Sequence, residues 1–346
     1  MYQRRAVALR QSLPGCEGDE ALSGGIIVRK EEPADIATAS IRRRLYELSR
    51  ERGEDLQLIL TWYAAERLLY RLSRSKHSRE FILKGAMLLN VWMDRSHRPT
   101  RDLDFAGQGD SSPEHLITVF DEICRVEVEP DGLQFDPESI QVTEIREFQE
   151  YQGQRIRLIA NLGKARINVQ VDIGFGDAVT PEARQITYPR LLDLPAPVIL
   201  VYPLETVVAE KLQAMVALGM VNSRMKDFYD VSMISRQFRF EGPTLAEAIR
   251  VTFDRRRTEI PKSIPTALSD EFAMDTEKGN QWKAFLKRSG LEKIPVNLQQ
   301  TIEELKVFVV PPLHAAAHGL DFKFEWTAGA PWSEMSGKDH SLTPET

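Results

Sequence analysis

The stretch Phe81–Phe105, FILKGAMLLNVWMDRSHRPTRDLDF, decides the fold that we expect for this chain. It predicts a short apolar strand, a tight turn at Gly85, an apolar helix and a second strand that carries Asp102 and Asp104. Because side chains two apart on a strand point the same way, both carboxylates would share one face while Leu103 enters the core. Such a pair repels unless a cation lies between the carboxylates, and their hard oxygens suit Mg²⁺. The alternative is a solvated loop pair in a chain with 51 acidic residues.

The composition is that of a globular protein without a membrane span. With 346 residues, 42% apolar and 28% charged, the chain is long enough for two domains or one large domain with extensions. No apolar run approaches the roughly 20 residues needed to cross a bilayer, and no secretory signal pattern opens the sequence. Cys16 and Cys124 are too few for a disulfide framework or a thiolate metal site, so we expect a cytoplasmic protein.

Charge is distributed unevenly along the chain. The formal net charge is −6, yet Ile41–Arg101 contains 14 Lys and Arg residues against 7 Asp and Glu residues. Arg67, Arg71 and Arg74 recur every three or four residues, which places them along one side of a predicted helix. A basic half next to an acidic metal site suits a polyanion, so one interpretation is RNA bound through the basic N-terminal helices. The other is a solvated helix surface that carries arginine.

The hydrophobic pattern divides the chain into a central α+β region and a helical C-terminal region. Residues 1–38 show no periodicity and are expected to form a mobile arm, and residues 39–200 combine helical and strand patterns. Residues 201–320 form amphipathic helical patterns, and residues 321–346 are expected to be a mobile tail. The pattern therefore predicts an α+β region followed by a helical region.

Three polar residues further along the chain are candidates to join the paired aspartates. Arg166–Ile173 alternates strongly, so Asp172 would end a half-buried strand on its polar face, although it also fits a surface aspartate before a turn. Lys211 falls among apolar neighbours on its helix, where it either extends to water or has an anionic partner. Asp227 shares its side of the next helix with apolar residues, whereas Asp230 is expected to point more outward.

Five segments carry a family resemblance: LKGAMLL at 83–89, RPTRDLDF at 98–105, VDIGFGD at 171–177, ETVVAEKLQAM at 205–215 and RMKDFYDV at 224–231. In order and spacing they resemble the bacterial abortive-infection AbiEii/AbiGii toxin family across residues 40–310. This resemblance implies a polymerase-β-like nucleotidyltransferase domain of mixed α/β class, flanked by N-terminal helices and a helical C-terminal region. It also implies a toxin with a separately encoded cognate antitoxin.

Carried over by position, the resemblance implies a role for each candidate residue. Asp102 and Asp104 would hold one or two Mg²⁺, with Asp172 as a further ligand. Lys211 would face the triphosphate of an NTP co-substrate, and Asp227 would be the acidic residue of the last motif. The residues expected to contact the nucleotide are Lys84, Gly85, Thr100, Lys211 and Lys226.

The phosphate turn departs from the pattern of the wider superfamily. Gly85-Ala86 lies 17 positions before Asp102, further than in the superfamily, and Ala86 stands where a hydroxyl-bearing serine is usual. Contact with the triphosphate would therefore depend on backbone N–H groups and on Lys84 or Lys211.

The expected function is that of an Mg²⁺-dependent nucleotidyltransferase toxin that transfers NMP from an NTP to an RNA acceptor, with tRNA expected first. The reaction needs in-line geometry, a metal and cations facing the pyrophosphate. The resemblance implies a place in a toxin–antitoxin or abortive phage-infection system. Two alternatives use the same residues: a metal-dependent ribonuclease, and a non-catalytic module that binds nucleic acid or a partner protein.

Overall fold

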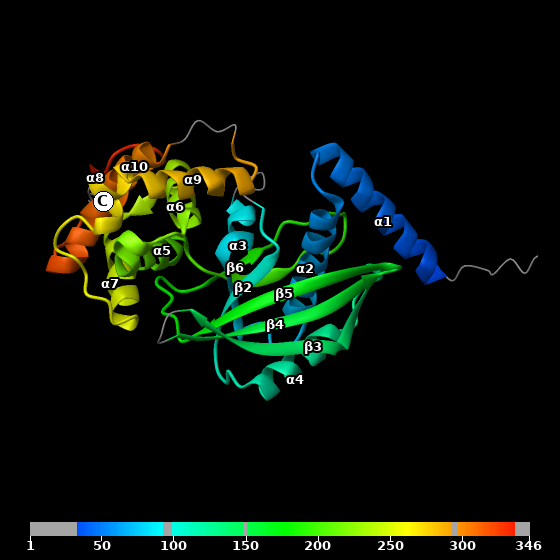
Figure 1. Cartoon of the computed structure of the whole chain (residues 1–346). Helices are drawn as coiled ribbons and strands as arrows, with labels where there is room; N and C mark the ends of the chain where they lie inside the picture. The colour runs from blue at the N-terminus through cyan, green and yellow to red at the C-terminus, as the bar shows by residue number, and fades with distance from the viewer. Residues whose placement is uncertain (1–32, 93–98, 148–150, 293–296, 336–346) are drawn as a thin grey trace, which may run out of the picture.

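The computed structural model describes residues 33–92, 99–147, 151–292 and 297–335 (Figure 1). These residues form a seven-stranded mixed sheet and a mainly helical C-terminal half, which confirms the predicted mixed α/β class. The expected N-terminal arm lies outside the described residues as far as residue 32, and from Pro33 onward the chain is helical. Residues 33–38, which we expected to belong to the arm, are therefore helical.

Seven strands make up the large sheet. They are β1 Phe81–Lys84, β2 Asp102–Gly107, β3 Leu133–Glu147, β4 Tyr151–Leu162, β5 Ala165–Phe175, β6 Arg184–Thr187 and β7 Val198–Val201. Among the described residues their order is β3-β4-β5-β2-β1-β7-β6, so β2 lies at the centre. Strand β2 pairs in parallel with β5 and antiparallel with β1, which sets Asp104 between Lys84 and Asp172.

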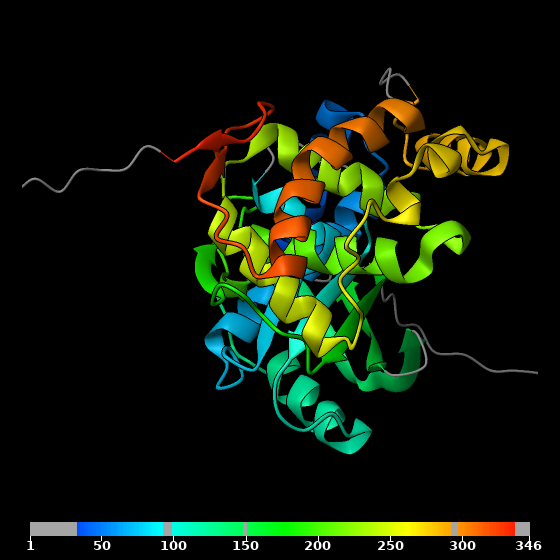
Figure 2. The ribbon, with the colours of Figure 1, turned by 90° about the vertical axis from the view of Figure 1, so that its left-hand side faces the viewer.

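The described helices fall into two groups. Those of the sheet half are α1 Pro33–Arg52, α2 Leu56–Arg74, α3 Gly85–Trp92 and α4 Pro113–Cys124. Those of the helical half are α5 Leu204–Leu218, α6 Met225–Gln237, α7 Gly242–Arg255, α8 Asp270–Met274, α9 Thr276–Arg288 and α10 Leu298–His318. Figure 1 shows the two halves side by side, and in Figure 2 the helix α10 crosses the front of the helical half. No helix within the described ranges is long and apolar enough to cross a membrane.

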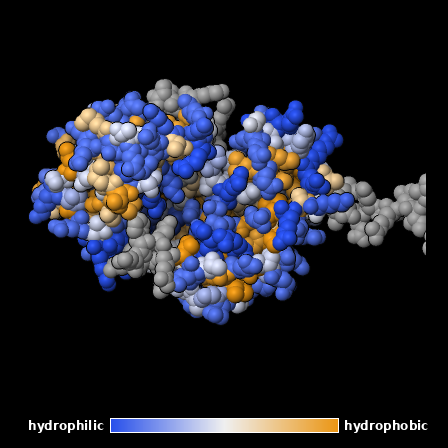
Figure 3. Space-filling model, in the orientation of Figure 1, coloured by the Kyte–Doolittle hydropathy of each residue, from blue (hydrophilic) through white to orange (hydrophobic). Residues whose placement is uncertain are grey.

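One face of the sheet is buried and the other is open. In β5 the residues Ile167, Val169, Val171 and Ile173 are buried, while those between them are partly or fully exposed. Helix α2 packs on β5 and α4 packs on β3, which covers the apolar face. Burying each such aliphatic side chain contributes about 1.5–3 kcal/mol. In the view of Figure 3 the surface is mainly hydrophilic, with hydrophobic residues gathered chiefly between α1 and the sheet.

The opening stretch folds as predicted, into strand, glycine turn, helix and strand. Gly85 has φ of +73°, and a Cβ added there would overlap the carboxylate of Asp104. Glycine is required at this turn for both reasons, because its left-handed backbone and the close approach of Asp104 leave no room for a side chain. Leu103 is 1% exposed, as expected for the core-facing residue between the two aspartates. The cationic turn at residues 93–98 lies outside the described residues.

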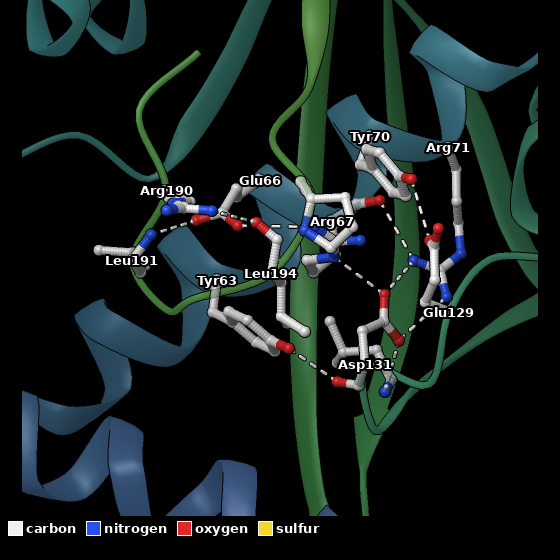
Figure 4. Close-up of polar contacts among 12 residues, drawn as sticks. Tyr63, Glu66, Arg67, Tyr70, Arg71, Glu129, Asp131, Arg190, Leu191 and Leu194 are labelled. Carbon is white, nitrogen blue, oxygen red and sulfur yellow. Dashed lines mark hydrogen bonds and ion pairs between the residues drawn. The ribbon is translucent and has the colours of Figure 1, made fainter. Parts of the chain in front are cut away.

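The prediction that a row of α2 arginines faces solvent or RNA is wrong for two of its three members (Figure 4). Arg67 is fully buried and Arg71 nearly so. Asp131 accepts from Arg67 Nε at 3.0 Å and from Arg71 Nη1 at 2.6 Å. Arg67 also donates to the Pro195 carbonyl at 2.7 Å. Helix α2 packs on β5 and also contacts β7. The side of α2 that carries Arg67 and Arg71 is therefore covered by protein rather than by solvent. Arg74 alone is exposed.

The first part of the predicted mobile tail is folded, which corrects the expectation for residues 321–335. Trp326 is buried and its indole N–H donates to the Ser235 carbonyl at 2.6 Å, and the indole of Trp332 donates to the Phe308 carbonyl at 2.9 Å. The two tryptophans anchor the segment. Its strands have only two or three residues, which is too short for a strand pattern to be recognised in the sequence. The second sheet consists of β8 Phe240–Glu241, β9 Phe324–Trp326 and β10 Ser333–Glu334. Residues 336–346 lie outside the described part.

Candidate active site

A cleft of about 340 Å³ opens where the central strands meet the helical half. Strands β1, β2 and β5 supply one side, and helices α5 and α6 supply the other. The cleft brings together most of the residues that the sequence singled out, namely Lys84, Gly85, Asp104, Asp172, Lys211, Lys226 and Asp227. Asp102 and Thr100 are not among the lining residues. Asp102 precedes Asp104 by two positions on the same face of β2, and the Thr100 carbonyl accepts from the Trp62 indole at 2.6 Å.

The paired aspartates carry negative charge that their surroundings only partly compensate. Burial raises the pKa of Asp104 to about 6, against the opposing influence of the Lys226 and Lys84 ammonium groups. Burial, followed by the neighbouring Asp172 carboxylate, raises the pKa of Asp102 as well. Raised pKa values in two neighbouring carboxyls at the edge of a cleft mark a place where a cation would be stabilising.

The chemistry of these side chains fits a hard divalent cation such as Mg²⁺. Asp102 and Asp104 offer oxygen donors only, and phosphate oxygens and water commonly complete the shell of such an ion. Within the described ranges no three His, Cys, Asp or Glu side chains are grouped so as to hold a metal. The third candidate, Asp172, is engaged by Arg155, whose Nε and Nη2 donate to the two carboxylate oxygens at 2.8 and 2.7 Å. Asp102 and Asp104 are therefore the candidate carboxylate pair for a metal ion, and Asp172 is the one engaged by an arginine.

Lys211 has anionic partners rather than extending to water. Its ammonium donates to Asp227 at 2.6 Å and to Asp230 at 2.8 Å. Arg224 also donates to Asp227, at 2.7 Å. Burial raises the pKa of Asp227, but Lys211 and Arg224 outweigh it and hold the pKa below its ordinary value. These contacts fix the lysine at the wall of the cleft as a positioned charge.

The outward orientation predicted for Asp230 is wrong. Its side chain is fully buried, because α6 packs against α5, α9 and α10 and therefore has no single solvent face. The ion pair with Lys211 is what makes this burial tolerable.

Three charged residues whose role sequence reasoning missed surround Lys84, and we call the four together the cleft network: Lys84, Asp177, Glu210 and Arg256. Lys84 lies 2.5 Å from Asp177 and 3.8 Å from Glu210, and Arg256 lies 3.0 Å from Asp177 and 3.1 Å from Glu210. Burial lowers the pKa of Lys84, but the Glu210 and Asp177 carboxylates outweigh it, so the lysine stays charged. Asp177 and Glu210 lay within the quoted motifs VDIGFGD and EKLQA, whereas Arg256 follows the end of α7 with no signal of its own.

Two aspartates at the centre of a mixed sheet, one of which lines a cleft walled by positioned cations, are the arrangement expected of a nucleotidyltransferase site. The family model described as "Nucleotidyl transferase AbiEii toxin, Type IV TA system" matches residues 67–306. The chain belongs to this family, as the sequence motifs predicted. The family comprises nucleotidyl transferase toxins of type IV toxin–antitoxin systems.

Two solved structures from Helicobacter pylori resemble the chain at low identity. JHP933 is 15% identical, with 73% of this chain and 89% of that chain covered at a TM-score of 0.41. A protein described as a candidate nucleotidyltransferase is 16% identical, with 74% and 94% covered at a TM-score of 0.42. Neither likeness is close enough to say how this chain works. No curated protein matches it.

Proposed function

We propose that this protein transfers the nucleotidyl group of an NTP to the end of an RNA, with tRNA as the expected acceptor, and that it acts as a toxin held in check by its own antitoxin. The proposal also includes dependence on Mg²⁺ and a cytoplasmic site of action. Membership of the AbiEii family supports the class of reaction and the existence of an antitoxin. The identity of the acceptor and of the metal is our inference from the site.

One observation carries the proposal: a single cleft unites Asp104 on β2 with Lys211 on α5 and Asp227 on α6. A carboxylate beside a positioned lysine is what transfer between phosphates requires, since catalysis there consists of orientation and charge stabilisation. The three residues lie far apart in sequence, so their convergence results from the fold.

Each residue has a role that follows from its surroundings. Asp102 and Asp104 would hold the divalent ion, which when bound supplies charge neutralisation at the phosphates and lowers the pKa of the attacking hydroxyl. Lys211, fixed by Asp227 and Asp230, presents a positive charge to the leaving pyrophosphate. Gly85 and Ala86, the first residues of α3, line the cleft, and the N-terminus of a helix favours an anion.

Further cations in the cleft complete the nucleotide site. Lys84 and Arg256 line it, together with Lys226. In this structure the first two bind Asp177, so a triphosphate would share or replace a carboxylate partner that is already present. Asp177 holds the two cations in place before the nucleotide arrives. Binding of the triphosphate therefore requires little rearrangement of these side chains.

Label transfer tests the proposal directly. Pure protein is incubated with each α-labelled NTP in turn, with Mg²⁺ and bulk tRNA, and the RNA is resolved on a denaturing gel. We expect covalent label on RNA with one or a few of the nucleotides, and none when a chelator removes the metal. If none of the four nucleotides transfers label to RNA, the proposed transferase activity is refuted.

The same gel separates the two alternatives. A ribonuclease would shorten the RNA in Mg²⁺ without any NTP. A non-catalytic module would give neither label nor shortening, and Asp102→Ala would leave any growth inhibition on expression unchanged. The transferase predicts that this substitution abolishes growth inhibition while the protein remains folded.

A further inference from the structure

The open face of β4 and β5 carries a row of cross-strand pairs that begins at the catalytic carboxylates. Counted away from the cleft, the pairs are Asp172 with Arg155, Gln170 with Arg157, Asn168 with Ile159 and Arg166 with Asn161. We call these eight residues the sheet ladder. Successive pairs are two residues apart on each strand, so all eight side chains lie on the face opposite the buried Val169 and Val171. At about 3.3 Å per residue the ladder extends for about 20 Å from Asp172 to Arg166.

The composition of the sheet ladder is that of a polyanion-binding surface. Its side chains are partly or fully exposed, with Arg157, Arg166 and Asn168 the most open. Beyond Asp172 it contains three arginines, three side-chain amides and one isoleucine, and no carboxylate. The neighbouring strand β3 places Thr143 beside Arg155 and Gln141 beside Arg157, and adds one carboxylate, Asp136, beside Ile159. Arginine and amide groups are the donors that most often bind phosphates and base edges.

Positive charge continues at the far end of the ladder. The β4–β5 turn carries exposed Lys164, and Arg42 of α1 lies against the turn at Gly163, where an added Cβ would come within 3.7 Å of its guanidinium. Figure 1 shows these long strands reaching from the helical half to the first turns of α1. A strand of nucleic acid that follows the ladder would therefore meet cationic side chains towards both ends of its course.

The position of the aspartates connects this face to the cleft. Asp104 and Asp172 line the cleft, while Asp102 lies outside the lining and beside Gln170 of the ladder. The carboxylates thus mark the border between a pocket of nucleotide size and an open polar face. In-line transfer requires the attacking hydroxyl to approach from the side opposite the leaving pyrophosphate. With the triphosphate in the cleft, the side from which the hydroxyl must come is the side of the ladder.

We propose that the acceptor RNA lies on the sheet ladder with its 3′ end at Asp102 and Asp104, rather than on the basic N-terminal helices. This inference rests on the proposed function, and it names the surface that gives that function its acceptor. Arg157 and Arg166 bind the phosphates upstream of the end. Arg155 has one side engaged by Asp172 and offers its remaining donor to the terminal phosphate.

The test compares two matched pairs of charge reversals. The ladder variant is Arg157→Glu with Arg166→Glu, and the helix variant is Arg43→Glu with Arg50→Glu, which makes the same charge change on exposed residues of α1. Affinity for fluorescently labelled bulk tRNA is measured by anisotropy over a series of salt concentrations, without NTP. Unchanged thermal unfolding midpoints establish that both variants are folded.

We expect the ladder variant to bind RNA at least tenfold more weakly, and the helix variant to bind like wild type. A second ladder variant replaces the same two arginines by glutamine. Its slope of log affinity against log salt should be shallower than that of wild type by about 0.7–0.9 for each lost phosphate contact. Loss in the helix variant alone, or equal loss in both, would overturn the proposal. Unchanged RNA binding in the ladder variant would also overturn the proposal and would point to a protein partner for this face.

The outcome for wild type separates this inference from the proposed function. If wild type labels RNA and the ladder variant binds RNA normally, the acceptor lies elsewhere and only the ladder proposal fails. If wild type binds and labels no RNA, the RNA acceptor itself is wrong and both proposals fall together.

Discussion

Two ionic groups in this protein have nearly the same composition and opposite surroundings. The first, which we call the buried arginine network, consists of Glu66, Arg67, Arg71 and Asp131 (Figure 4). The second is the cleft network of Lys84, Asp177, Glu210 and Arg256. Each has two cations and two carboxylates at short range. All four side chains of the first are at most 7% exposed, whereas Lys84, Glu210 and Arg256 of the second are 16–19% exposed and line a cleft.

The two networks differ in access rather than in charge, and under our proposal this difference separates a structural ion network from one that binds the nucleotide. The buried arginine network ties α2 to the turn at Asp131 and to the carbonyl of Pro195, and its side chains are almost inaccessible to solvent. In the cleft network a phosphate can replace a carboxylate as the partner of Lys84 or Arg256, and no buried charge is then left without a counter-charge. The first should therefore respond to mutation in stability, and the second in nucleotide affinity.

The largest effect is expected from Asp131→Ala. It leaves two buried guanidiniums without their shared carboxylate, and breaking a buried pair in this way costs about 3–5 kcal/mol. Chemical denaturation should show this loss as a shift of the unfolding midpoint. The comparison variant is Asp193→Ala, whose carboxylate is 81% exposed in its pair with Arg190 and should change stability very little. Equal effects from the two would break the distinction between the networks.

The next effect concerns pH and Glu66. Burial raises the pKa of Glu66 to about 7, while its Oε2 accepts the Leu191 N–H at 2.7 Å. The folded-state pKa is above the unfolded value, so the stabilisation is present below about pH 4.5 and is lost as the pH rises through about 7. Glu66→Gln should remove this loss. Between about pH 5 and pH 8 the unfolding free energy of wild type should fall by about 1–3 kcal/mol more than that of the variant. Parallel pH profiles would contradict the prediction.

A smaller effect is expected in the cleft network. Lys84→Gln keeps a hydrogen-bond donor toward Asp177 but removes a positive charge that faces the nucleotide, so KM for the NTP should rise about tenfold with little change in stability. Lys76→Gln is the matched control, because this exposed lysine pairs with Glu122 on the surface. A stability loss like that of Asp131→Ala, with KM unchanged, would make the cleft network a structural element too.

The smallest effect concerns Asp172, which pairs with Arg155 and is also a candidate metal ligand. Arg155→Gln frees Asp172 from its bidentate pair, so the site gains a third oxygen ligand and should bind Mn²⁺ severalfold more tightly. Free Mn²⁺ measured by electron paramagnetic resonance gives the affinity without any turnover. Arg157→Gln, next along the same strand face, should leave it unchanged. Unaltered affinity in both would show that Asp172 is not a metal ligand.

The sequence was most informative where a local rule decides the structure. The glycine turn and the two-residue spacing of Asp102 and Asp104 follow from backbone geometry, and both are found as predicted. The apolar neighbours of Lys211 correctly raised the prospect of an anionic partner. The family motifs then predicted which distant segments converge on one cleft.

The sequence was least informative where the environment comes from elements far away in the chain. Arg67 and Arg71 have the spacing of a solvated row, and only the packing around α2 shows that they are buried. Asp230 was misjudged for the same reason, since α6 is covered on several sides. Arg256 joins the cleft through a contact with Asp177, and no local pattern encodes a partner so remote in sequence.

The central claim is that Asp104, the β2 carboxylate that lines the cleft, belongs to the centre for nucleotidyl transfer. Its most direct test is the single-turnover rate of label transfer to RNA by Asp104→Asn, beside wild type and the exposed control Asp193→Asn. The substitution preserves shape and removes one negative charge, so the rate should fall by about a thousandfold while the unfolding midpoint stays within the range of the control. Transfer by Asp104→Asn at a rate close to that of wild type would contradict the claim and place the reaction elsewhere on the protein.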